Sequence, residues 1–78
     1  MLPIRVLFFA SLKERLKRGQ ANLESAIALP VLEVWQRSSG ETVFPANLLV
    51  SINQEYANAE TLVHPGDEVA FFPPVTGG

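Results

Sequence analysis

The segment Glu68–Phe72 (EVAFF) runs directly into two prolines, and this junction constrains the fold more than any other feature of the chain. The bulky, branched and aromatic residues of the segment predict a β-strand. Because proline cannot donate a hydrogen bond to a neighbouring strand, Pro73 and Pro74 must end that strand. We therefore expect a packed domain over residues 1–72 and an extended, flexible tail over residues 73–78.

Two helices are expected from their end signals. Ser11 is a good N-cap for a helix over residues 11–19, and Glu14 completes a capping box with it. Gly19 would close this helix. Pro30 suits the first turn of a second helix, which Gly40 would end. The side chains expected on the buried side of this second helix are Val31, Leu32, Val34 and Trp35.

Apolar and branched residues predict the remaining strands at residues 4–10, 22–30 and 47–53, with a brief strand around 55–57. Asn53-Gln54 is expected to turn the chain between the last two of these, and residues 64–67 (HPGD) form another turn by composition. The second strand is expected to form a hairpin-like pair with the first. This arrangement is an α+β fold.

Charged and polar residues show which face of each strand lies outside, because side chains alternate across a strand. Arg5, Ser51 and Glu68 are such markers on three strands. The large apolar residues that share the outer face with them are Leu7, Phe9, Leu49 and Phe72. Those expected to point into the core are Ile4, Val6, Phe8, Leu48, Val50, Ile52, Val69 and Phe71. Apolar side chains gathered on an outer face usually bind a partner, although a second covering helix is the alternative.

Length and composition are those of one small domain. The chain has 78 residues, of which 47% are hydrophobic and 18% charged, and it has no cysteine. Disulfides, thiolate metal sites and a cysteine nucleophile are thereby excluded. The longest apolar run, residues 6–10, is too short to span a membrane, and no signal segment begins the chain, so we expect a cytoplasmic protein without membrane contact.

Charge is divided along the chain. Residues 1–37 hold all six basic side chains against three glutamates, a net charge of +3, whereas residues 38–78 hold five acidic side chains and no basic one. Such an acidic half repels phosphate backbones, which argues against a nucleic-acid partner. It is expected to be steered toward a basic protein surface.

The residue types needed for autonomous catalysis are not grouped in the sequence. His64 is the only histidine and precedes Pro65-Gly66 in a turn, so we expect no metal site. The serines lack a nearby base or oxyanion motif, and no glycine-rich phosphate loop is present. The group that remains is the terminal carboxylate on Gly78, which is ionised at neutral pH.

The tail is suited to carrying that carboxylate into a narrow channel. Two prolines stiffen its start, Val75 and Thr76 favour extended geometry, and Gly77 and Gly78 have no side chain to obstruct passage. Six extended residues reach about 20 Å at ~3.3–3.6 Å each. The expected site is therefore made of the tail residues Pro73, Pro74, Val75, Thr76, Gly77 and Gly78 beside the outer apolar residues.

Three stretches, "VLFFASLKER", "VSINQEYA" and above all "GDEVAFFPPVTGG", resemble the family of molybdopterin synthase small subunits. The resemblance covers the whole length. It implies a ubiquitin-like β-grasp fold, with a mixed sheet of four to five strands and one or two helices packed on one face. The stretch over residues 19–45 is shorter than the family pattern and leaves about ten residues for the second helix.

The resemblance also implies a function. In this family an adenylating, E1-like activating enzyme uses ATP on the terminal glycine, and a sulfur donor protein then leaves a thiocarboxylate there. The large synthase subunit takes the loaded tail and transfers sulfur to a cyclic pyranopterin precursor. Carried to this chain, Gly78 bears the sulfur, Gly77 is its slim neighbour, and Phe9 and Phe72 lie in the partner contact. The family implies a heterotetramer with the large subunit, no bound cofactor, and active-site side chains on the large subunit.

Three other functions remain open at the level of sequence. A sulfur carrier for thiamine-type synthesis shares the fold and the terminal Gly-Gly. A ubiquitin-like protein modifier would join Gly78 to lysines through the same activated carboxylate. An interaction module with an inert tail would tolerate loss of the glycines, which a carrier would not.

Overall fold

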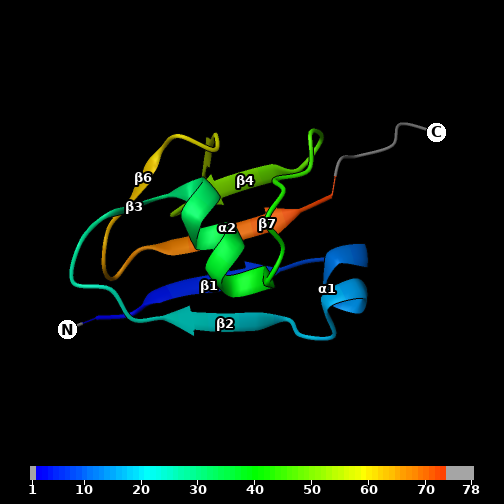
Figure 1. The fold of residues 1–78 in the computed structure, drawn as a ribbon, viewed down its shortest axis with the longest axis horizontal. Coiled ribbons are helices and arrows are strands. Elements are labelled where there is room, and N and C mark those ends of the chain that lie inside the picture. The colour runs from blue at the N-terminus through cyan, green and yellow to red at the C-terminus, as the bar shows by residue number, and fades with distance from the viewer. Residues whose placement is uncertain (1, 74–78) are drawn as a thin grey trace.

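The computed structural model describes residues 2–73, which form seven short strands and two helices (Figure 1). In chain order they are β1 (Ile4–Phe8), α1 (Ser11–Leu16), β2 (Gln20–Leu23), β3 (Leu29–Pro30), α2 (Val31–Ser39), β4 (Leu49–Ile52), β5 (Glu55–Ala57), β6 (Leu62–Val63) and β7 (Glu68–Phe72). The predicted tail residues 74–78 lie outside the described part of the chain.

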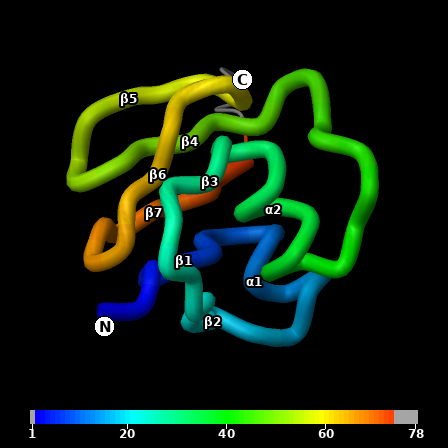
Figure 2. The backbone as a smooth tube through the Cα atoms, turned by 60° about the vertical axis from the view of Figure 1, so that its left-hand side comes forward, coloured from blue at the N-terminus to red at the C-terminus, as the bar shows by residue number. Residues whose placement is uncertain are grey.

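Five of the strands form one mixed sheet, in the order β2-β1-β7-β4-β5. Strands β1 and β7 are parallel, and every other neighbouring pair is antiparallel. The predicted hairpin-like pairing of the second strand with the first is confirmed, but the predicted range 22–30 is wrong, because β2 covers residues 20–23 and residues 29–30 form the separate strand β3. Strands β3 and β6 lie side by side (Figure 2) and form a separate two-residue ladder, which the sequence analysis missed.

Helix α2 lies across one face of the sheet and covers the core (Figure 1). Its limits were predicted correctly, because Pro30 is the N-cap and Gly40, at φ 80°, ends the helix in the left-handed conformation. The buried positions are Val31, Val34, Trp35 and Ser38, which follow the i, i+3, i+4, i+7 spacing of one helix face. Leu32 was expected among them, but it is 37% exposed because it lies on the other side of that stripe.

Inward and outward faces of the strands follow the predicted alternation. The core contains Ile4, Val6, Phe8, Leu48, Val50, Val69 and Phe71, and the predicted inward residue Ile52 is partly buried against it. Trp35 is the centre of this core. Its ring centroid lies 5.1 Å from that of Phe71, 6.1 Å from that of Phe44 and 6.3 Å from that of Phe8.

Helix α1 differs at both ends from the prediction. The N-cap is Ala10, at φ 53°, and no side chain caps the helix, so the expected capping box of Ser11 and Glu14 does not form. The chain turns sharply here because β1 is still paired at Phe9, whose N–H donates to Phe71 O (3.1 Å). The helix ends at Lys17, at φ 59°, two residues before the expected Gly19.

Two predicted turns are confirmed at the end of the sheet away from α1. Asn53 and Gln54 both have positive φ, as a two-residue hairpin between β4 and β5 requires. The 64–67 turn is closed by the N–H of Asp67 donating to His64 O (3.0 Å). The Asn53 Nδ2 donates to Asp67 Oδ1 (3.1 Å), so the two turns are joined.

Candidate functional site

The face of the sheet opposite α2 carries apolar side chains where β1 and β7 end. In the strand register Leu7 lies beside Ala70, and Leu49 lies beside Phe72, so side chains from three strands share this face. The ring of Phe9, just after β1, meets the ring of Phe72 edge to face, with centroids 6.5 Å apart.

A third aromatic residue, Tyr56 on β5, extends this group toward the sheet edge. Its ring centroid lies 6.1 Å from that of Phe72. Tyr56 is 77% exposed and Phe9 is 47% exposed. We call the set Leu7, Phe9, Leu49, Tyr56 and Phe72 the aromatic patch. Exposed aromatic rings gathered on one surface are typical of surfaces that bind another protein.

The parallel pairing of β1 and β7 sets the position of the patch relative to the end of the chain. Both strands run toward the same end of the sheet, where Phe8 is paired with Phe71. Phe9 and Phe72 are the next residues along each strand, and Pro73 follows Phe72 directly. The chain therefore leaves the sheet beside the exposed aromatic rings.

Four predicted site residues, Leu7, Phe9, Leu49 and Phe72, are thus brought together on one surface, with Pro73 at its edge. The predicted site residues Pro74, Val75, Thr76, Gly77 and Gly78 lie outside the described residues. The sequence analysis missed Tyr56 because it did not assign faces to the brief strand predicted around residues 55–57. The predicted turn at Asn53-Gln54 was a usable signal, because a two-residue turn there places Tyr56 opposite the outward-facing Ser51, which is the pairing in the structure.

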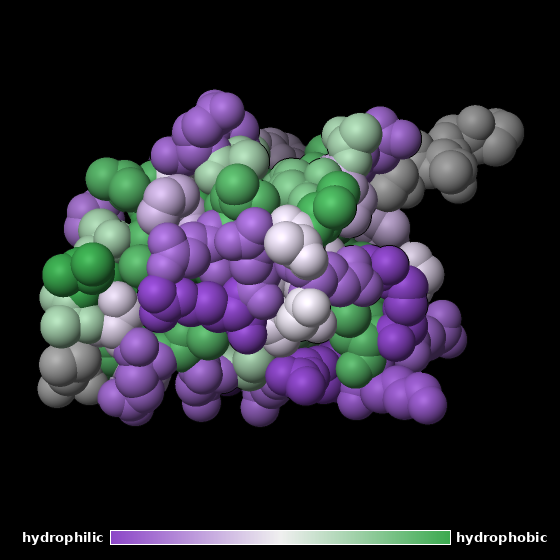
Figure 3. Space-filling model, viewed as in Figure 1, coloured by the Kyte–Doolittle hydropathy of each residue, from purple (hydrophilic) through white to green (hydrophobic). Residues whose placement is uncertain are grey.

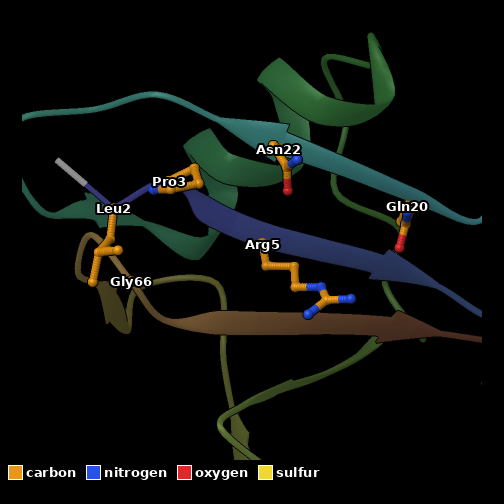
Figure 4. Close-up of a pocket in the computed structure, with 6 residues that line it drawn as sticks. All are labelled: Leu2, Pro3, Arg5, Gln20, Asn22 and Gly66. Carbon is orange, nitrogen blue, oxygen red and sulfur yellow. The ribbon is translucent and has the colours of Figure 1, made fainter.

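Polar side chains lie on the same face at β2 and near the start of β1 (Figure 4). Arg5 on β1 is paired with Asn22 on β2, and Gln20 lies two residues before Asn22 on the same side. These three side chains line an open hollow with Leu2, Pro3 and Gly66. The aromatic patch is therefore bordered by polar side chains on the β2 side, where Gln20 is paired with Leu7.

Several polar side chains elsewhere in residues 2–73 bond to the backbone of their own segment. The hydroxyl of Ser38 donates to Val34 O (2.6 Å) inside α2, and that of Ser25 donates to Ile27 O (2.7 Å). His64 is exposed, with its Nδ1 3.8 Å from Asp67 Oδ2. Within this part of the chain no group of three His, Asp or Glu side chains is placed to hold a metal ion. Nor is any helix there long and apolar enough to cross a bilayer.

The sequence and fold of this chain are similar to those of known proteins. The model of the ThiS family matches residues 6–78. The chain is 40% identical over 80 residues to a molybdopterin synthase sulfur carrier subunit of Haemophilus influenzae, covering 96% of this chain and 99% of the relative. It is 35% identical over 82 residues to the protein of the same name from Escherichia coli, with the same coverage.

A solved structure shows the same fold at lower identity. The crystal structure of SAMP1 from Haloferax volcanii superposes with a TM-score of 0.82 and 23% identity, covering 97% of this chain and 99% of that one. Together with the mixed sheet and the two helices described above, this likeness confirms the α+β, ubiquitin-like β-grasp expected from the sequence.

Proposed function

This chain belongs to the ThiS family, and from that premise we propose that it is the sulfur-carrier subunit of a molybdopterin synthase. Two relatives of that name are 35–40% identical to it over nearly their whole lengths. The observation that carries the proposal is the exit of the chain beside the aromatic patch. A carrier needs a docking surface next to its reactive end, since a docked surface then directs the tail into the partner's site.

The reactive group is the carboxylate of Gly78. A carboxylate is a poor electrophile until one of its oxygens becomes part of a good leaving group. An activating enzyme supplies the leaving group. The carboxylate attacks the α-phosphorus of ATP, which forms an acyl-adenylate and releases pyrophosphate. A sulfur nucleophile, equivalent to hydrosulfide, then displaces AMP and leaves a thiocarboxylate on Gly78.

The large synthase subunit is the partner that receives the loaded tail. It would cover the aromatic patch while the tail carries sulfur to the pyranopterin precursor. The carrier itself contributes binding and reach, and the catalytic side chains belong to its partners. Phe9, Tyr56 and Phe72 are the aromatic anchors available for this contact, a residue type that often dominates binding energy at protein interfaces.

The test is the intact mass of the protein purified from cells with an active molybdenum-cofactor pathway. Replacement of one terminal oxygen by sulfur adds about 16 Da, and fragment ions that contain Gly78 separate this from oxidation of methionine. A thiocarboxylate on Gly78 that disappears on incubation with the large subunit and precursor, with formation of molybdopterin, supports the proposal. Gly78 found in isopeptide bonds to lysines supports the protein-modifier alternative instead. An unmodified Gly78, even after incubation with ATP, activating enzyme and a sulfur source, contradicts the carrier function.

A further inference from the structure

The two lysines of the chain, Lys13 and Lys17, stand four residues apart on α1 and at its end. Both are exposed, and with Ala10, Ser11 and Glu14 they line one open hollow. Within residues 2–73 neither lysine has a carboxylate within 4.0 Å. Their basic neighbours are engaged, since Arg15 pairs with Glu41 (3.2 Å) and Arg18 donates to Ser38 O (3.3 Å).

The hollow begins at Ala10, the residue that follows Phe9 of the aromatic patch. Helix α1 begins two residues after Phe9, and the N–H of Phe9 is bonded to Phe71 O next to the end of β7. Figure 1 shows α1 at the end of the molecule toward which β1 and β7 run. Seen from the α2 side, hydrophilic side chains gather over α1 (Figure 3).

The acidic residues of the sheet lie at the opposite end. Glu68 begins β7, Asp67 precedes it, and Glu55 begins β5 just after the turn that is joined to Asp67 through Asn53. Residues 11–18, by contrast, hold four basic side chains and one acidic one. Helix α1 is therefore a locally basic element at the end of the sheet where the chain leaves it, even though Glu41 pairs with Arg15 there and Arg5 lies beside Glu68 at the other end.

An apolar patch alone does not specify how a partner is oriented, because the hydrophobic effect is not directional. Charges at one rim of the patch do specify it, and they also raise the association rate. The stem of Lys13 passes over Gly19, since a Cβ atom added to that glycine would lie 3.2 Å from Lys13 Cε.

We infer that Lys13 and Lys17 form a basic rim that receives carboxylates of an acidic segment on the large synthase subunit, next to the apolar surface that covers the aromatic patch. The inference rests on the proposed function for the identity of the partner. The rim fixes the docking orientation so that the exit of the chain faces the partner's site.

The experiment compares association rates with the purified large subunit for two variants of equal net charge. Lys13→Gln/Lys17→Gln removes two positive charges from the rim. Arg5→Gln/Arg37→Gln removes two from exposed positions elsewhere, near the start of β1 and on α2. Rates are measured by stopped flow at about 50 mM and about 500 mM salt, since screening shortens the reach of charge interactions from ~14 Å to ~4 Å.

At low salt the lysine variant is expected to associate about 10-fold more slowly than the wild type, and at high salt the two rates should converge. The arginine variant should remain within about 2-fold of the wild type, and Lys13→Arg/Lys17→Arg should restore the rate. An equal fall in both double variants would show that only net charge matters, which overturns the inference. An unchanged rate in the lysine variant, with circular dichroism showing that it is folded, overturns it as well.

These outcomes are distinct from failure of the proposed function. If wild-type protein binds the large subunit and carries the thiocarboxylate but the lysines make no difference, only the rim is disproved. If wild-type protein neither binds the large subunit nor acquires sulfur, the proposed function fails, and the rim fails with it.

Discussion

Trp35 makes both the main apolar contacts of the core and one of its polar connections. Its side chain is fully buried and lies against three phenylalanine rings. Its Nε1 donates to Val43 O (2.9 Å), which ties the loop after α2 back to the helix. A tryptophan is favoured here because its ring fills the space between helix and sheet while its N–H finds a partner.

Replacing Trp35 with alanine should lower the free energy of unfolding by about 3–5 kcal/mol, because a large cavity replaces the indole. Trp35→Phe should cost less, about 1–3 kcal/mol, because most of the apolar contact remains while Val43 O loses its donor. Urea denaturation followed by circular dichroism measures both values. Equal losses in the two variants would mean that the hydrogen bond, and not packing, dominates at this position.

Phe9→Ala should weaken binding to the large subunit by about 10–100-fold, as removal of a central aromatic anchor does at other interfaces. Because Phe9 is about half exposed, stability should change by less than about 1 kcal/mol. Ile27→Ala is the matched control, since Ile27 is 68% exposed and lies in the loop between β2 and β3, away from the patch. Titration calorimetry of both variants checks the difference, and equal affinity of Phe9→Ala and the wild type would contradict the docking role of the patch.

At the scale of elements, the sequence was most informative where local signals and tertiary packing agree. Helix α2 begins after Pro30 and ends at Gly40 as expected, because a fixed φ and a left-handed glycine act locally. Helix α1 has equally good local signals, yet Ser11 is already inside it. The pairing of β1 with β7 extends to Phe9 and forces Ala10 to start the turn. The β3–β6 ladder was missed because two-residue strands have no periodicity.

Gly40→Ala should reduce stability by about 1–2 kcal/mol, the cost of holding a residue with a Cβ atom in the left-handed conformation. No heavy atom lies within 4 Å of the added Cβ, so backbone strain is the only expected contribution. Gly19→Ala is the comparison, because its φ is not in the left-handed range and its Cβ would meet only the movable stem of Lys13. Thermal unfolding should therefore show a larger fall in stability for Gly40→Ala than for Gly19→Ala. The reverse order would contradict the assignment of backbone strain to Gly40.

At the scale of the whole molecule, the order of the strands in the sheet could not be predicted from the alternation of residues along each strand. Alternation identified the two faces of β1, β4 and β7 and hence four residues of the aromatic patch. It contains no information on which strands become neighbours, because pairings such as Val6 with Val69 join distant parts of the chain. The sheet order also decides that the patch, the basic rim and the exit of the chain share one end.

Removal of Gly78 should leave a folded protein that binds the large subunit but transfers no sulfur. The deletion moves the terminal carboxylate back by one residue, about 3.5 Å, and misplacement by even ~1 Å can cost ~100-fold in rate. Thermal unfolding and affinity, measured beside sulfur transfer, separate the loss of reach from loss of fold. Transfer at the wild-type rate by this variant would contradict the carrier function and favour the interaction module.

The central position of β7 has a consequence for the synthesis of the protein. Strand β7 lies between β1 and β4, although it is the last of the described strands to leave the ribosome. Until then β1 lacks its parallel neighbour, and Trp35 lacks the ring of Phe71. A growing chain therefore cannot assemble the sheet that displays Phe9 beside Phe72. Chains that end before β7 are thereby expected not to compete with finished carriers for the same partners.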